Sequence, residues 1–113
     1  MEARQISDLI EKEFGKCSDP KAIALIRELL VSPRCQKRPW DYGKKGDTYP
    51  CWIVAEHRAS NTAFVYCEDG FGPKCPWGLL WISGDNLSMG MDSSWFTSLE
   101  AAVKDSFAWE ERK

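Results

Sequence analysis

Three short apolar segments joined by short links constrain the fold more than any other feature of this sequence. They span residues 51–57, 62–67 and 78–83, and each is rich in the aromatic and β-branched residues that favour strands. Because short links can join only antiparallel neighbours, the pattern predicts an antiparallel sheet. A further short strand near residues 88–91 would bring the sheet to three or four strands.

Side-chain alternation predicts which residues of the first two strands share a face. In the second strand, Phe64 and Tyr66 oppose Ala63, Val65 and Cys67. In the first strand, two sets are expected on opposite faces: Trp52, Val54 and Glu56 on one, and Ile53, Ala55 and His57 on the other.

Helical periodicity precedes the strands. Apolar residues at helical spacing predict a helix over residues 2–14 that ends at a Gly15 cap. The run Ser18-Asp19-Pro20 predicts the start of a second helix, because a capping side chain is followed by proline at the first helical position. This helix should end before Pro33, so the two helices would form an α-hairpin.

A last helix is predicted after the strands. Thr97 and Glu100 fit a capping box at its start. Leu99, Val103 and Phe107 would face the sheet, and the charged tail 110–113 is expected to fray.

The order of these elements predicts one α+β domain over residues 1–113. It would comprise an N-terminal α-hairpin, a central antiparallel sheet, and a C-terminal helix packed on that sheet. A hydrophobic content of 43% is enough for a core, and a net charge of −2 gives no global attraction to nucleic acid or to an anionic membrane. Since no apolar run is long enough to span a bilayer and the start has no signal-peptide pattern, we expect a cytoplasmic protein.

The cysteines and the lone histidine do not form a recognisable metal motif. The five cysteines are Cys17, Cys35, Cys51, Cys67 and Cys75, an odd number that favours free thiols in a reducing compartment. A zinc site would need Cys51, His57, Cys67 and Cys75, which lack a close ligand pair. In a straight strand, Cys51 and His57 would lie roughly 20 Å apart. No metal or other cofactor is therefore expected.

Two kinds of catalytic site remain to be considered. A thiol-dependent enzyme would pair Cys67 or Cys75 with His57, the only histidine, and it is kept as the alternative function. The adjacent carboxylates Glu68 and Asp69 point to opposite faces of an extended chain and make no ready acid/base pair. The glycines in the stretch CEDGFGPKCPWGLLW lack the spacing of a phosphate-binding loop and fit a turn between strands.

A basic segment lies between the second helix and the first predicted strand. Residues 34–45 hold five basic residues and one aspartate, together with Trp40 and Tyr42, and we expect a long loop there. One basic segment in an acidic protein is a weak nucleic-acid footprint, so no nucleic-acid partner is expected.

Acidic and aromatic residues gather instead at the predicted sheet turns and before the last helix. Such side chains make good protein-contact surface, and the negative charge would speed encounter with a basic partner. The predicted contact residues are Glu68, Asp69, Phe71, Trp77, Asp85, Asp92 and Trp95, with Trp77 and Trp95 as anchors.

Several of these stretches resemble segments of small, single-domain bacterial proteins of largely unassigned function. The resemblance spans residues 38–95 and is carried by RPWDYG at 38–43, YPCW at 49–52, YCEDGFGP at 66–73, PWGL at 76–79 and MGMDSSW at 89–95. In size, layout and surface character the chain is also similar to immunity proteins that neutralise bacterial toxins. This likeness implies a non-enzymatic protein-binding module whose partner is a toxin domain.

Overall fold

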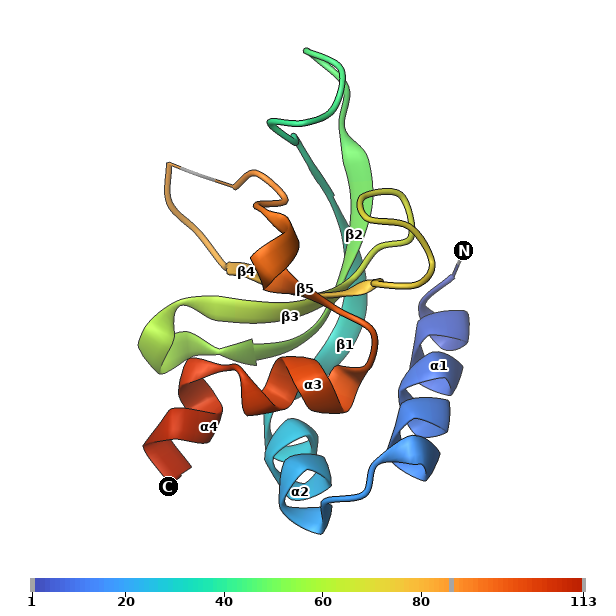
Figure 1. The fold of residues 1–113 in the computed structure, drawn as a ribbon, viewed down its shortest axis with the longest axis vertical. Helices are drawn as coiled ribbons and strands as arrows, with labels where there is room; N and C mark the ends of the chain where they lie inside the picture. The colour runs from blue at the N-terminus through green and yellow to red at the C-terminus, as the bar shows by residue number, and fades with distance from the viewer. Residues whose placement is uncertain (1, 86, 113) are drawn as a thin grey trace.

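The computed structural model describes residues 2–85 and 87–112 and has the α+β architecture expected from the sequence. Two helices precede a five-stranded antiparallel sheet and two short helices follow it (Figure 1). The α-helices are α1 (Ala3–Lys16), α2 (Pro20–Leu29), α3 (Leu99–Lys104) and α4 (Phe107–Arg112). The strands are β1 (Leu30–Arg38), β2 (Tyr49–His57), β3 (Thr62–Tyr66), β4 (Trp77–Trp81) and β5 (Trp95–Phe96). Two 3₁₀ turns, η1 (Arg58–Ser60) and η2 (Asp92–Ser94), complete the order.

The strands lie in chain order, β1-β2-β3-β4-β5, and the three predicted strands form the centre of the sheet. The prediction was wrong at both edges. Residues 30–38 form β1, although residues 30–32 were expected to end the second helix and residues 33–38 to lie in a loop. The last strand lies at Trp95–Phe96 rather than near 88–91. Pro33 is tolerated in β1 because an edge strand can lose a backbone donor on its free side.

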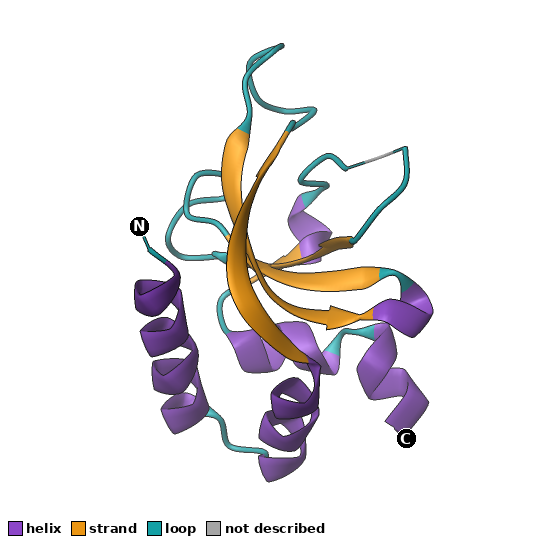
Figure 2. Cartoon of the chain, turned by 180° about the vertical axis from the view of Figure 1, so that it is seen from behind, coloured by secondary structure: helices purple, strands orange, loops and turns teal. Residues whose placement is uncertain are grey.

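The sheet bends sharply along β1 and β2, whose far ends stand across β3 and β4 (Figure 2). The register between β2 and β3 shifts between Ile53 and Ala55, which identifies a β-bulge at Val54. The bulge overturns the predicted alternation after Ile53, because Ala55 joins Val54 and Trp52 in the cluster beneath the helices.

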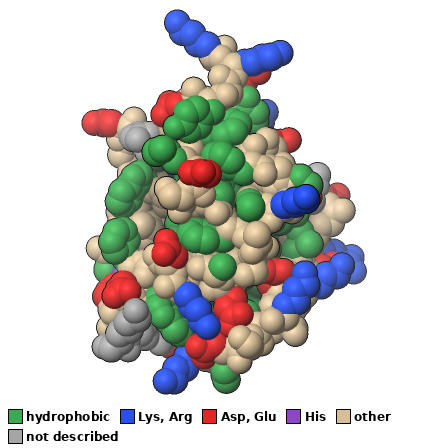
Figure 3. All heavy atoms as spheres, in the orientation of Figure 1, with side chains coloured by type: hydrophobic (Ala, Val, Ile, Leu, Met, Phe, Trp, Pro, Cys, Tyr) green, Lys and Arg blue, Asp and Glu red, His purple; other side chains and the backbone are tan. Residues whose placement is uncertain are grey.

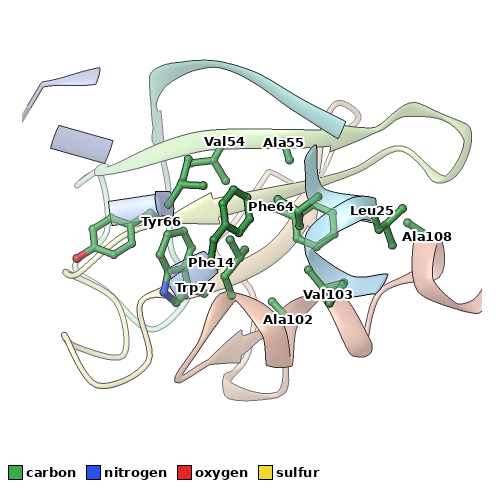
Figure 4. Packing of buried hydrophobic residues seen from close by; sticks show 14 of the residues in the cluster. Phe14, Leu25, Val54, Ala55, Phe64, Tyr66, Trp77, Ala102, Val103 and Ala108 are labelled. Carbon is green, nitrogen blue, oxygen red and sulfur yellow. The ribbon is translucent and has the colours of Figure 1, made fainter. Parts of the chain in front are cut away.

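The main core lies between the sheet and the helices. Phe64 and Tyr66 point into it as predicted, and Trp77 packs edge-on against Tyr66 with ring centroids 4.8 Å apart (Figure 4). From the helices, Phe14, Leu25 and Val103 close the other side of this core.

A second core fills the concave face of the bent sheet, where loops rather than helices cover the strands. Its buried members are Cys51, Ile53, Ala63, Val65, Cys67, Leu80, Met89 and Trp95. The indole Nε1 of Trp95 donates to the carbonyl oxygen of Met89 at 2.7 Å. Position 78 must be glycine here, because a Cβ would lie 2.9 Å from the Trp95 ring.

The helix ends agree with the sequence in one case and differ in two. Asp19 caps α2 by accepting from the backbone of Lys21 at 2.9 Å, as predicted. Gly15 lies inside α1, which continues to Lys16. The α3 cap is Ser98 rather than Thr97, and its hydroxyl accepts from Ala101 N at 3.1 Å.

Two carboxylates join the helices instead of closing local caps. Glu100 does not reach back to Thr97: its carboxylate accepts from the backbone of Ser18 at 3.1 Å and of Asp19 at 2.9 Å. Glu13 of α1 accepts from Leu99 N, the first residue of α3, at 2.8 Å. Each carboxylate therefore satisfies free N–H groups at the start of another helix.

Candidate protein-binding surface

A cavity of about 270 Å³ opens along β4, where that strand runs beyond its short partner β5. We call it the Trp81 cavity. Leu79, Leu80 and Trp81 form its wall, and η2 contributes Ser93 and Ser94. Asp105 and Ser106 come from the turn between α3 and α4, and Phe107 is the first residue of α4. Thr62, Ser88 and Gly90 complete the lining. Three elements distant in sequence thus meet at one hollow.

Large apolar side chains are exposed around this cavity. Trp81 is 44% exposed and Phe107 is 56% exposed, and both line the cavity. Met91, which follows the lining residue Gly90, is 57% exposed. The prediction that Phe107 faces the sheet was wrong, since α4 starts a new helix there and turns the ring outward. Exposed aromatic rings and methionine are typical of protein contact sites.

The predicted acidic residues are exposed but divided between two loops. Asp85 and Asp92 lie on the segment between β4 and β5, and Asp92 precedes Ser93, which lines the Trp81 cavity. Glu68 and Asp69 lie on the loop between β3 and β4, which emerges on the other side of β2 (Figure 1). Burial, and a hydrogen bond from its hydroxyl to Glu68, raise the pKa of Tyr66 to about 12. Glu68 therefore already has a partner within the chain.

The three predicted aromatic contact residues are structural. Trp77 is 3% exposed in the helix-side core and Trp95 is 5% exposed in the concave core. Phe71 is half-buried, with its ring centroid 5.2 Å from Trp40 and 6.4 Å from Trp95. Trp77 and Trp95 therefore cannot serve as surface anchors in this structure, because their rings are buried in the two cores.

The basic segment 34–45 is divided between a strand and an exposed tip. Arg34, Lys37 and Arg38 belong to β1, and Arg38 is only 1% exposed. Arg38 donates from Nε to Gln36 Oε1 at 2.8 Å and from Nη2 to the carbonyl oxygen of Trp81 at 2.7 Å, while burial lowers its pKa. Lys44 and Lys45 lie in the loop between β1 and β2, where Lys and Arg spheres project at the top of Figure 3.

The structure does not assemble the cysteine–histidine pair of the alternative function. Cys67 is 1% exposed and interacts with Cys51 of the neighbouring strand, whose hydrogen bond lowers the pKa of Cys67. His57 ends β2 six residues beyond Cys51, with Nδ1 2.6 Å from Ser60 Oγ and Nε2 2.6 Å from Glu111 Oε2. Cys75 packs half-buried in the concave core.

Within residues 2–85 and 87–112, no group of three His, Cys, Asp or Glu side chains could hold a metal ion. None of the helices in that part of the chain combines the length and the apolar character needed to cross a bilayer.

Sequence reasoning missed three residues that matter at the cavity: Trp81, Asp105 and Phe107. Trp81 lies on the predicted strand 78–83, and strand alternation does not show that β5 ends too early to cover it. Asp105 and Phe107 looked like parts of one continuous helix. The sequence feature that could have predicted the break between the helices is Asp105-Ser106, because both residues are poor helix formers and lie in the middle of the expected helix.

Comparisons with protein-family models, with curated proteins and with solved structures found no match to this chain.

Proposed function

We propose that this chain is a non-enzymatic protein-binding module whose contact surface is centred on the Trp81 cavity. The observation that carries the proposal is the exposure of Trp81 and Phe107 in the lining of one hollow, with the exposed Met91 next in sequence to the lining residue Gly90. Burying such side chains against a partner would remove apolar surface from water, worth roughly 25 cal/mol for each Å².

Charge supports a basic partner. Asp85, Asp92 and Asp105 are exposed on the segments that border the cavity. On the upper left of the face in Figure 3, hydrophobic and acidic side chains intermingle, whereas Lys and Arg lie at the tip, on the right and along the lower part. A negative surface of this kind favours encounter with a positive one.

The most concrete form of this function is neutralisation of a toxin domain in a bacterial cytoplasm. A small domain in whose described residues we find no assembled catalytic set suits an inhibitor, which acts by occupying or covering the partner's surface. Preformed contact side chains would reduce the ordering cost of binding.

Site-specific photo-crosslinking in the native host tests the proposal. A photoreactive phenylalanine analogue would replace Met91 at the cavity rim and, as a control, Ala24, which is exposed on α2. We expect a discrete protein adduct with the analogue at position 91 and not at position 24. Mass spectrometry of the adduct would identify the partner, and a toxin domain is the expected result.

Absence of an adduct at position 91, or the same adducts at both positions, would contradict a binding surface at this cavity. An adduct with a partner that lacks toxic activity would contradict the immunity role and leave the binding function intact.

A further inference from the structure

We propose that the Trp81 cavity receives a single lysine or arginine side chain of the protein partner. This inference rests on the proposed binding function and specifies the chemistry that the partner presents. The inference rests on two exposed aromatic residues, Trp81 and Phe107, that line the same small cavity as the carboxylate-bearing Asp105.

The size of the cavity suits one side chain. Its volume is about 270 Å³, slightly below the ~300–1,000 Å³ typical of sites for drug-sized ligands. Leu79 and Leu80 give the wall an apolar character that fits the methylene stem of a long side chain. Trp81 and Phe107 add aromatic faces, which attract a cation within about 6 Å of the ring centre.

Asp105 supplies the charge. Its backbone N–H closes the end of α3 by donating to Ala102 O at 3.2 Å, and its carboxylate has no ion pair or hydrogen bond with any residue that the structure describes. The neighbouring Lys104 is directed elsewhere, with Nζ 3.6 Å from Asp19 Oδ2 and 3.6 Å from Glu100 Oε2. The carboxylate of Asp105 is therefore available to a cation from outside.

The hydroxyls of two other lining residues, Ser106 and Thr62, are already engaged. The Ser106 hydroxyl donates to Val103 O at 2.6 Å and accepts from Trp109 N at 3.2 Å. Thr62 Oγ1 lies 2.7 Å from Ser60 Oγ. Ser93 and Ser94 also offer hydroxyls to a polar ligand, but Asp105 is the one lining residue in the described part of the chain that carries a charge, and that charge favours a cation.

The charges near the cavity also favour a cationic side chain as its occupant. No lysine, arginine or histidine is among the described lining residues. Among the lining residues, Trp81 does contact a cation, because its carbonyl oxygen accepts a hydrogen bond from Nη2 of the buried Arg38. Arg38 does not line the cavity, and the exposed Asp92 precedes the lining residue Ser93 in η2.

Titration of the purified, isotope-labelled protein with short capped peptides tests this inference directly. The probes are acetyl-Gly-Lys-Gly-amide, acetyl-Gly-Arg-Gly-amide and the neutral acetyl-Gly-Gln-Gly-amide. We expect the two cationic peptides to shift the Trp81 indole and Asp105 amide resonances in a saturable, salt-sensitive manner. Asp105→Asn should weaken that binding about two- to fivefold, and Trp81→Ala should weaken it to a similar degree.

Two control variants match these changes. Asp8→Asn removes an exposed carboxylate from α1, and Tyr42→Ala removes a 63% exposed aromatic ring from the β1–β2 loop. Neither should change the peptide titration. Equal shifts from the glutamine peptide, no shift from either cationic peptide, or unchanged binding in Asp105→Asn would overturn the inference.

The same variants separate this inference from the proposed function. In the crosslinking experiment, Asp105→Asn should reduce the adduct formed at position 91. A strong adduct that is insensitive to Asp105→Asn would overturn the cationic side-chain site while the binding function stands. Absence of any adduct together with saturable peptide binding would contradict the function in that host and support the site chemistry.

Discussion

Glu56 shows how a single buried carboxylate depends on its partners. Its side chain is 3% exposed, and it lies 2.8 Å from Arg34 Nη2 and 3.2 Å from Arg58 Nη2. The hydrogen bond from Arg34 lowers the pKa of Glu56, although burial opposes the shift. A carboxylate with a lowered folded-state pKa stabilises the fold above its unfolded pKa of about 4.3 and loses that contribution as the pH falls through the folded value.

Replacing Glu56 with glutamine should therefore lower the free energy of unfolding by about 1–3 kcal/mol at pH 7, because two arginines lose their charged acceptor. The loss should shrink as the pH falls below about 4.3, where Glu56 of the unmodified protein also becomes protonated. Urea unfolding of both proteins at pH 7 and pH 3 measures the difference. A loss that stays constant over this range would contradict the role of the charge.

Glu11→Gln provides the matched control for that experiment. Glu11 is 64% exposed and lies 3.9 Å from Arg27 Nη2, so its ion pair is screened by solvent. Its replacement should change the free energy of unfolding by no more than about 0.5 kcal/mol.

At the scale of elements, the start of α3 distinguishes two adjacent hydroxyl residues. Ser98 caps the helix, whereas Thr97 is exposed and makes no cap. Ser98→Ala should lower the free energy of unfolding by about 1 kcal/mol, and Thr97→Ala should leave it nearly unchanged. Thermal and urea unfolding compare the two variants. An equal or larger loss of unfolding free energy in Thr97→Ala would contradict the assignment of the α3 cap to Ser98 and would favour the Thr97 capping box predicted from the sequence.

Capping residues and side-chain alternation correctly predicted the elements that depend only on neighbouring residues in the sequence. Asp19-Pro20 identified the start of α2, and alternation identified β2, β3 and the inward faces of Phe64 and Tyr66. The bulge at Val54 was not predictable, because the sequence around it alternates in more than one acceptable register. β1 was missed because its basic residues and proline are unfavourable for a central strand and acceptable at an edge.

At the scale of the whole molecule, the bent sheet separates two cores that helices and loops cover on opposite faces. The candidate site follows from this arrangement: β5 ends early, and the turn between α3 and α4 then meets the uncovered part of β4. No local pattern encodes that meeting, since it joins residues from β3 to α4. The acidic, aromatic character of the segment 85–95 was predictable, but which tryptophans are exposed depends on the packing of both cores.

Trp95 and Trp81 therefore have opposite roles, and matched replacements separate them. Trp95→Ala removes a ring that fills the concave core, and should lower the free energy of unfolding by about 3–5 kcal/mol. Trp81→Ala removes a half-exposed ring and should cost less than about 1 kcal/mol, while weakening the capture of cationic peptides. Urea unfolding and peptide titration measure the two effects. If Trp95→Ala kept its stability, or Trp81→Ala lost as much as Trp95→Ala, the assignment of one tryptophan to the fold and the other to the surface would fail.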